Sequence, residues 1–456
     1  MDEQIPLIER FATYGAGLKY EDIPRDAVRS AKWLVFDSLG AGLGGYRSPL
    51  GRKVAEFSVR QMPSDLSAVL GDGRRSTPEG AAFANATMIK ILGMDESHRM
   101  AGHIAAQVMT AALAVGEANH IGGRDLIVSM VAAYDLAVRV GRAVRHPQGK
   151  RGLDLKGTVG TMAAALAAGL CAGLNADRLS HAMALAADMS SGTEQYVYEQ
   201  GQCETKDLIS GFAARSGVFA ARLAECGFYG SRGALDGEYG FFRAFGDGFD
   251  PAVFAGLGEG FAISSSAFRP HAGCRRAHHA VDAVQEVLKQ VELNPSSVEK
   301  VVVGTYRWAT QPTFRVDPNP ACRQLAGYSI QTATAVALVR HNTWPDDLDH
   351  WDDPQVRRLR HLIEVEVDPE IEGNYPNANG CRVLVTLNDG RTFEGYVEYA
   401  KGEPENPMTD AELQEKFEVL AGPILPKGRV GEVFSACMHL EQEEDVGALL
   451  ALCTGR

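Results

Sequence analysis

The chain has 456 residues, of which 45% are hydrophobic and 23% charged, with a formal net charge of −13. This composition is typical of a soluble globular protein, and the length allows two or three domains. The negative charge argues against nucleic-acid binding as the main activity, because phosphate recognition usually requires a basic face. It leaves room for a local basic pocket that binds an anionic small substrate.

Targeting and redox features are few. Eight cysteines are scattered without a C-x-x-C pair, so we predict neither a disulfide framework nor a zinc site. Residues 1–6 lack the basic and apolar regions of a signal peptide. The longest apolar run, residues 159–174, is shorter than the roughly 20 residues of a membrane span. We therefore expect a cytoplasmic protein that does not associate with membranes.

Nearly every segment from residue 6 to about 248 predicts helix. Apolar residues recur at three- and four-residue spacing in residues 7–14, 24–41, 125–144 and 176–187. Alanine-rich runs such as residues 163–168 let helix axes approach closely and favour helices that are apolar on most faces. This part of the sequence predicts an all-helical domain.

The pattern changes near residue 262. Residues 277–288 and 329–339 predict helices, whereas residues 298–308, 362–367 and 382–387 predict strands. Asn388-Asp389-Gly390 predicts a hairpin whose second strand is residues 392–397. A capping box at residues 409–412 opens a further helix, residues 411–420. We predict a mostly α fold: an all-helical domain of residues 1–263 and 400–456, with a smaller α+β lid domain of residues 264–399.

Residues 93–103 bring six polar side chains together between two apolar helical segments, 81–92 and 104–118. A helix break inside a core leaves backbone groups that need partners, so one interpretation is structural. Asp95 and Ser97 would then cap the second helix, with His98 and His103 in solvent. Nucleotide-binding, zinc-protease and serine-hydrolase motifs are absent from the sequence. Two histidines beside an arginine are more often not a metal site, so we predict no metal.

Several stretches, in order along the chain, resemble the family of 2-methylcitrate dehydratase, cis-aconitate decarboxylase and iminodisuccinate epimerase, called MmgE/PrpD. They include Met94-Asp95-Glu96-Ser97-His98 with His103, Gly157-Thr158-Val159-Gly160-Thr161, Glu204-Thr205-Lys206, Cys274-Arg275-Arg276-Ala277-His278, and residues 211–217, 235–242 and 403–413. The resemblance implies a large helical domain with an α+β lid, a homodimer, and catalysis without cofactor or metal.

Five positions depart from the pattern of the family's dehydratases and decarboxylases, and at one of them Ser97 replaces a threonine but keeps the hydroxyl. Gly93 stands in place of an acid, Asp154 in place of a histidine, and Asp207 and Ile209 in place of a basic residue and a histidine. Because the anion-binding groups persist, the resemblance favours the iminodisuccinate epimerase branch. It implies an isomerase that inverts the α-carbon of this polycarboxylate by removing and returning a proton. A dehydratase or decarboxylase is the alternative, and a non-catalytic relative is the third.

The candidate catalytic residues are Lys206, His103 and His278. Burial of Lys206 at the entry of an alanine- and glycine-rich helix would lower its pKa towards that of a base, whereas a salt bridge to Glu204 or Asp207 is the structural alternative. His103 opens an apolar helix, whose dipole favours the neutral imidazole that a base requires. A hydrogen-bonded core histidine is the alternative there.

The candidate substrate-binding residues are mostly polar or cationic. A guanidinium binds a carboxylate with two parallel hydrogen bonds, so the basic cluster of the lid suits a substrate with several carboxylates. Lys156, Tyr196 and Cys274 are weaker candidates, and Arg276 and His279 suit a solvated helix face. The predicted substrate-binding residues, between the helical domain and the lid, are Arg269, Arg275, Asp95, Ser97, His98, Arg99 and Tyr198.

Overall fold

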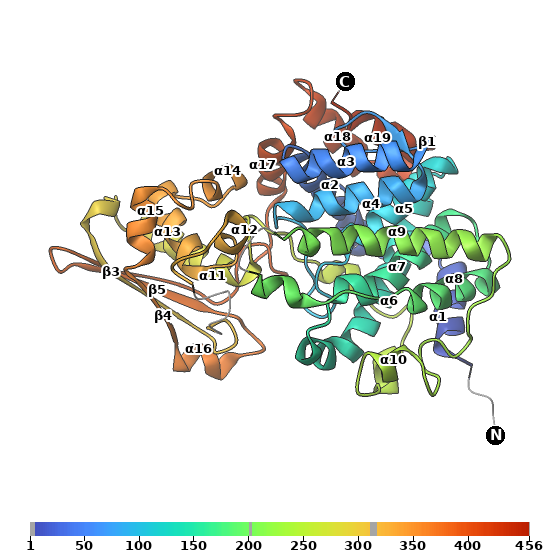
Figure 1. Cartoon of the computed structure of the whole chain (residues 1–456), viewed down its shortest axis with the longest axis horizontal. Coiled ribbons are helices and arrows are strands. Elements are labelled where there is room, and N and C mark those ends of the chain that lie inside the picture. Colours follow the sequence, from blue (N-terminus) through green and yellow to red (C-terminus); the bar gives the residue numbers. More distant parts are fainter. Residues whose placement is uncertain (1–4, 200–202, 311–316, 456) are drawn as a thin grey trace.

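The computed structural model describes residues 5–199, 203–310 and 317–455. Figure 1 shows a large body of helices beside a smaller body that contains a sheet, with the C-terminal helices on the large body. The prediction of a mostly α fold with a smaller α+β part is confirmed. No helix among the described residues is long and apolar enough to cross a membrane.

The large body is a bundle in which α7 is central. Its alanine- and glycine-rich sequence lets it pack closely against α5, α6, α8 and α9 (Figure 1). The helices of this body before the lid are α1 (Leu7–Gly17), α2 (Arg25–Tyr46), α3 (Pro49–Gln61), α4 (Pro78–Ile91), α5 (Ala105–Ala118), α6 (Gly123–Arg151), α7 (Leu155–Cys171), α8 (Ala176–Asp188), α9 (Thr205–Glu225) and α10 (Phe241–Ala244).

The bundle is not entirely helical, which corrects the sequence prediction. A short antiparallel ribbon joins β1 (Pro63–Ala68) to β2 (Arg75–Ser76). The turn between these strands uses Gly71 and Gly73, whose positive φ angles of 72° and 75° suit glycine. The side chain of Asn85 on α4 binds the ribbon, accepting from the backbone N–H of Leu70 at 3.0 Å.

The smaller body is built on a four-stranded sheet in the order β4-β3-β5-β6, with β3 parallel to β4 and the other pairs antiparallel. The predicted hairpin at Asn388-Asp389-Gly390 is confirmed, with Gly390 at a φ of 84°. Helices α11 and α13 cover the sheet (Figure 1). The elements are α11 (Arg275–Leu288), β3 (Val298–Thr305), α12 (Arg323–Ala326), α13 (Ile330–Arg340), α14 (Pro345–Leu348), α15 (Pro354–Arg360), β4 (Ile363–Val367), α16 (Pro369–Asn374), β5 (Cys381–Leu387) and β6 (Thr392–Val397).

The C-terminal helices pack back on the bundle rather than on the sheet. They are α17 (Asp410–Ala421), α18 (Arg429–Met438) and α19 (Val446–Leu452). Phe417 on α17 stacks on Phe36 of α2, with ring centroids 4.1 Å apart. One buried hydrophobic cluster accordingly unites residues 7–263 with residues 408–453, and a separate cluster spans residues 277–387. The domain boundaries at 263/264 and 399/400 stay a prediction.

Candidate functional site

The loop between α4 and α5 lies where the large body meets the segment that leads into the smaller one. Gly93 has a φ of 66°, and a Cβ there would lie 2.8 Å from the carbonyl oxygen of Gly273. The backbone of the second body therefore fills the place where an acidic side chain would begin. Ser97 and Ala267 exchange two backbone hydrogen bonds of 2.9 Å, which tie the loop to the same segment.

Asp95 is the centre of this loop. Lys90 Nζ, on α4, lies 3.0 Å from both of its carboxylate oxygens, and Arg269 pairs with the same carboxylate while donating to the Asp95 carbonyl at 2.6 Å. Burial opposes ionisation, but the charges of Lys90 and Arg269 hold the pKa of Asp95 well below its usual range. Asp95, predicted to bind substrate, is thus an anion that orders its neighbours.

His103 is one of those neighbours. Its Nδ1 lies 3.1 Å from Asp95 Oδ2 and 2.8 Å from the carbonyl oxygen of Glu96, and both are acceptors. We therefore assign the proton to Nδ1, which leaves Nε2 as an acceptor. Burial and the positive charge of Lys90 lower the pKa of His103 to about 3. An uncharged imidazole agrees with the sequence expectation for His103, although burial and Lys90, rather than a helix dipole, are its causes here, and its role as a base stays a prediction.

The structural interpretation of the loop, in which Asp95 and Ser97 cap α5 and the histidines lie in solvent, is wrong about the cap and about His98. Glu96, rather than Asp95 or Ser97, binds the first N–H of α5, accepting from Ala105 at 3.1 Å. Its other carboxylate oxygen accepts from the Tyr134 hydroxyl. His98 is buried against Tyr134 rather than solvated. Burial raises the pKa of Glu96 to about 8, so this carboxyl retains a proton at neutral pH.

Two further lysine–aspartate pairs lie beside Lys90, and α7 carries the first. Asp154 caps α7 by accepting from the backbone N–H of Lys156 at 2.9 Å. Its carboxylate also lies 2.5 Å from Lys156 Nζ and accepts from the Tyr196 hydroxyl at 2.9 Å. The residue that replaces the family histidine is thus a partner that holds a buried lysine in place.

The second pair is at the start of α9. Lys206 Nζ lies 3.3 Å from Asp207, the salt bridge that was the structural alternative, and 5.5 Å from the ring centroid of Tyr328 in the smaller body. Lys206 keeps 15% of its side-chain surface exposed, whereas Lys90 keeps 3%. Burial lowers the pKa of Lys90 to about 7, with Lys156 and Lys206 close enough for their charges to contribute.

Sequence reasoning missed Lys90 as a site residue. The signal was available, because a lysine in an otherwise apolar helical run such as residues 81–92 needs a buried anionic partner. The identity of that partner could not be read from spacing, since the Lys90 side chain returns to a loop that also receives Arg269 from 174 residues away.

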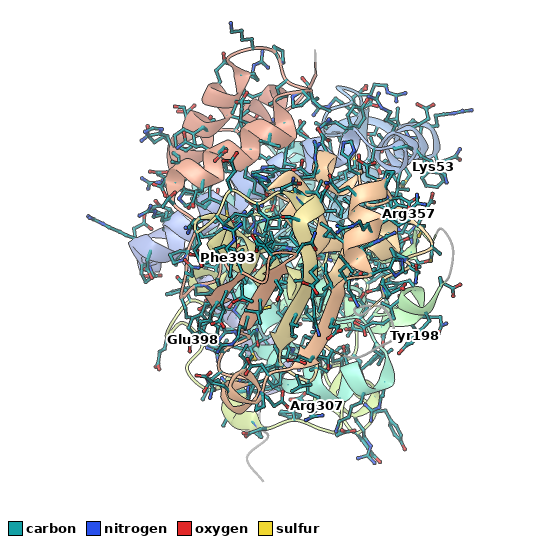
Figure 2. All side chains as sticks on the ribbon, turned by 90° about the vertical axis from the view of Figure 1, so that its left-hand side faces the viewer. Lys53, Tyr198, Arg307, Arg357, Phe393 and Glu398 are labelled. Carbon is teal, nitrogen blue, oxygen red and sulfur yellow. The ribbon has the colours of Figure 1, made fainter. Side chains whose placement is uncertain are left out.

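Of three further predicted substrate-binding residues, two are paired with carboxylates of the protein and one is exposed at the surface. Arg275 pairs with Glu403 at 2.6 Å, and Arg99 lies 3.4 Å from Glu403 and 2.9 Å from Glu405. Tyr198 is 54% exposed, and Figure 2 shows it at the edge of the molecule. No contact among the described residues joins these three to Lys90, Lys156 or Lys206.

Two other predicted residues are buried. Each of the three guanidinium nitrogens of Arg269 donates to a protein oxygen, on Asp95 or Gly273. His278 packs its ring against His271, with centroids 5.3 Å apart, and burial holds its pKa well below the usual range. His278 is therefore a buried histidine close to Arg269, which itself pairs with Asp95.

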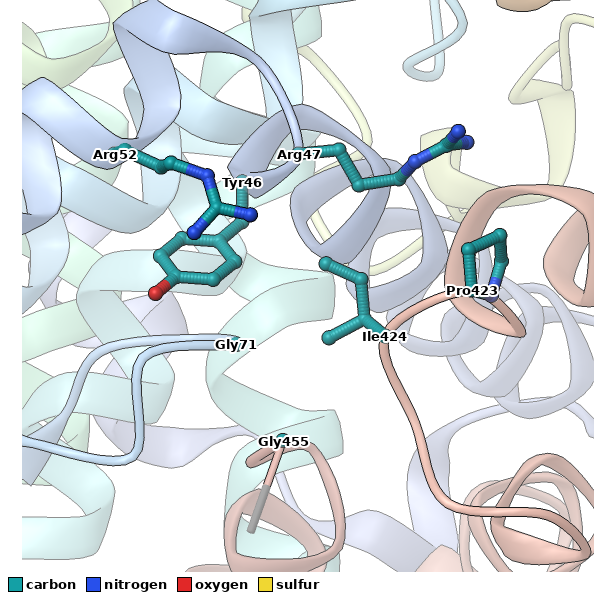
Figure 3. Close-up of a pocket in the computed structure, with 7 residues that line it drawn as sticks. All are labelled: Tyr46, Arg47, Arg52, Gly71, Pro423, Ile424 and Gly455. Atoms are coloured by element: carbon teal, nitrogen blue, oxygen red, sulfur yellow. The ribbon is translucent and has the colours of Figure 1, made fainter.

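A cavity of about 400 Å³ lies elsewhere, between the start of α3 and the C-terminal region. Figure 3 shows Arg52 over the ring of Tyr46 on one side and Ile424 with Pro423 on the other. Its lining contains no carboxylate, histidine or lysine side chain. This cavity therefore lacks the acid–base side chains that surround Lys90.

Comparison with known proteins identifies relatives along almost the whole chain. A cis-aconitate decarboxylase of Aspergillus terreus is 26% identical over 96% of this chain and 94% of its own length. A human cis-aconitate decarboxylase is 27% identical over 98% of this chain and 95% of its own. A cis-aconitate decarboxylase-like protein of Aspergillus oryzae is 27% identical over 96% of this chain and 95% of its own length.

These relatives overturn one expectation. Decarboxylases are lyases, so the prediction of an isomerase of the epimerase branch is wrong. The family itself is established by two models, the MmgE/PrpD N-terminal domain, which matches residues 9–253, and the MmgE/PrpD C-terminal domain, which matches residues 271–440. With both domains present in order, the chain belongs to the MmgE/PrpD family.

Proposed function

We propose that this protein is a lyase of small polycarboxylates, and that decarboxylation of an unsaturated tricarboxylate such as cis-aconitate is its reaction. The observation that carries the proposal is the position of Lys156 and Lys206 around Lys90, which contacts the Asp95–His103 pair. The names of the curated relatives give the reaction class.

The lysines suit carboxylate binding even though each has an aspartate partner. An ammonium group has three N–H donors, so Asp154 or Asp207 leaves donors of Lys156 or Lys206 for the substrate. Each aspartate also holds its lysine in place, at 2.5 Å between Asp154 and Lys156 Nζ and 3.3 Å between Asp207 and Lys206 Nζ. Positive charge is thus fixed in place before the substrate binds.

Decarboxylation places specific demands on these groups. Loss of CO₂ leaves an electron pair that spreads through the double bond towards a neighbouring carboxylate, and one proton completes the conversion of tricarboxylate to dicarboxylate and CO₂. Fixed ammonium groups beside the carboxylate that gains charge would lower the barrier. We assign proton delivery to Lys206, because it keeps more exposed surface than Lys90 or Lys156.

A dehydratase is the second candidate function. The unprotonated Nε2 of His103 favours it, because removal of water from a hydroxy-tricarboxylate begins with transfer of a proton to a base. The two reactions differ in their products, since only decarboxylation releases CO₂.

The experiment is incubation of the purified protein with cis-aconitate or 2-methylcitrate in D₂O, followed by proton NMR and a CO₂ assay. We expect CO₂ and a deuterated dicarboxylate from cis-aconitate. A new alkene without CO₂ from 2-methylcitrate would identify the dehydratase. Exchange of a substrate proton without net loss of either compound would contradict both lyase reactions.

A homodimer, which the family resemblance implies, stays a prediction for this chain. Light scattering on the purified protein should give twice the chain mass of 49.0 kDa. A mass of one chain at micromolar concentration would contradict it.

A further inference from the structure

Lys90 is a buried charged residue to which the proposed reaction gives no role. It lies in the last turn of α4, between Ile89 and Ile91, with 3% of its side-chain surface exposed. A lysine is retained at such a position only where partners offset the loss of hydration. The charged groups that face it come from the α4–α5 loop, the segment entering the smaller body, α7 and α9, and are Asp95, Arg269, Lys156, Lys206 and Asp207.

The partner of Lys90 is also the partner of His103. Lys90 Nζ contacts both oxygens of Asp95 at 3.0 Å, and Arg269 contacts Oδ1. His103 Nδ1 lies 3.1 Å from Oδ2. Because Lys90 and Arg269 together fix the plane of the carboxylate, the oxygen that faces His103 is fixed as well.

A second layer supports this arrangement from behind. Lys416 on α17 pairs with Asp37 on α2 and donates to the carbonyl oxygen of Met94 at 2.6 Å. The backbone that carries Asp95 is therefore held by the C-terminal region, while Lys90 and Arg269 hold its side chain. Of these residues, Lys90 is the one that contacts the Asp95 carboxylate from α4, the helix before the loop.

We propose that Lys90 is a positioning residue that acts through Asp95 to hold His103 as the neutral Nδ1–H tautomer, with Nε2 available to the substrate. The assignment of Nε2 to a substrate rests on the proposed lyase function. The state of the imidazole does not, and it can be measured without turnover.

The charge of Lys90 has a defined effect on His103. Burial and Lys90 lower the pKa of His103, whereas Asp95 raises it. Replacing Lys90 by an uncharged residue removes an opposing charge and leaves the Asp95 anion, which Arg269 still accompanies. The pKa of His103 should therefore rise, and a purely packing role of Lys90 would not move it.

The first experiment is an NMR titration of the histidine rings in the full-length protein, with His103 assigned from the His103→Gln variant. We expect Lys90→Met to raise the pH at which His103 titrates by one unit or more, and Lys90→Arg to leave it near the wild-type value. Lys32→Met is the matched control, because Lys32 is a partly buried lysine paired with Glu441 on the C-terminal region. An unchanged His103 titration in folded Lys90→Met would overturn the proposal.

A second variant covers the case in which Lys90→Met does not fold. Lys90→Gln keeps a hydrogen-bond donor to Asp95 without the charge, and it should give the same rise. In the active enzyme, the acid limb of kcat/KM should move to higher pH by the same amount as the NMR titration. If the wild-type protein has no lyase activity but Lys90→Met shifts the His103 titration, the positioning role of Lys90 is supported and the proposed function is rejected. If the protein is an active lyase and the titration of His103 does not shift, the proposed function is supported and the positioning role is rejected.

Discussion

Arg275 Nη2 lies 2.6 Å from Glu403 Oε1, in an ion pair that joins α11 to the turn before the C-terminal helices. Glu403 is 2% exposed and also faces Arg99, at 3.4 Å, and His279, at 3.6 Å. Burial opposes ionisation, but Arg275 and His279 hold the pKa of Glu403 below its usual range. These arginines therefore neutralise a buried carboxylate of the protein itself.

From this pair we predict that Arg275→Gln acts on stability more than on substrate binding. Removing the guanidinium leaves Glu403 partly uncompensated, which should lower the free energy of unfolding by about 3 kcal/mol. Urea unfolding and KM measure the two effects, and Arg357→Gln, at an exposed arginine labelled in Figure 2, is the control. A tenfold rise in KM without loss of stability would restore Arg275 as a substrate-binding residue.

Lys206→Ala should lower kcat/KM by about 10²- to 10⁴-fold, because it removes the proposed proton donor and one carboxylate-binding charge. Lys53→Ala is the control, since Lys53, labelled in Figure 2, is 67% exposed. Its partner is Glu204, at 3.0 Å. Product formation by NMR and unfolding by urea should be measured on both variants. Wild-type turnover in Lys206→Ala would remove Lys206 from the mechanism.

Glu96 gives a prediction about pH and stability. Its pKa is about 8 in the folded protein, against 4.5 for an ordinary glutamate. Between these values the folded state binds more protons than the unfolded state, so the contribution of Glu96 to stability is lost as pH rises through this range. The loss is about 1.4 kcal/mol per pH unit.

The Glu96→Gln variant tests this, because it resembles the protonated carboxyl at every pH. The difference in unfolding free energy between the variant and the wild type should therefore grow in favour of the variant from pH 5 to pH 8. Glu432→Gln, at a glutamate that is 60% exposed, is the control. A difference that stays constant over this range would show that Glu96 is ionised in the folded protein.

Metal independence is the last prediction. Among residues 5–199, 203–310 and 317–455, no group of three or more histidine, cysteine, aspartate or glutamate side chains has the arrangement of a metal site. We expect dialysis against a chelator to leave turnover unchanged. Loss of turnover that a single divalent ion restores would contradict this expectation.

Much of the architecture follows from the sequence, because local patterns govern it. Helix periodicity places α13 and α17 to within one residue, and Asn388-Asp389-Gly390 specifies the β5–β6 hairpin through the φ of its glycine. The β1–β2 ribbon escaped prediction. Its six-residue first strand is mostly exposed or half-exposed and lacks a clear alternation of apolar side chains.

The loop of residues 93–103 could be recognised from its composition, whereas burial and the charge of Lys90, which lower the pKa of His103, depend on the tertiary structure. The partners of its side chains could not be predicted, because they come from distant parts of the chain. Arg269 reaches Asp95 across 174 residues, and Lys416 reaches Met94 across 322. Glu96 caps α5, whereas the Asp95 carboxylate pairs with two cations, Lys90 and Arg269.

The sequence by itself determined which side chains are available: lysines, aspartates and a histidine on alanine-rich helices of a mostly α fold. Only the tertiary structure decided which of them are neutralised. Arg269 and Arg275 have the chemistry to bind a substrate, but buried carboxylates of Asp95 and Glu403 lie beside them. Charge in a buried setting is controlled by its nearest opposite charge, and that neighbour is fixed by packing rather than by sequence spacing.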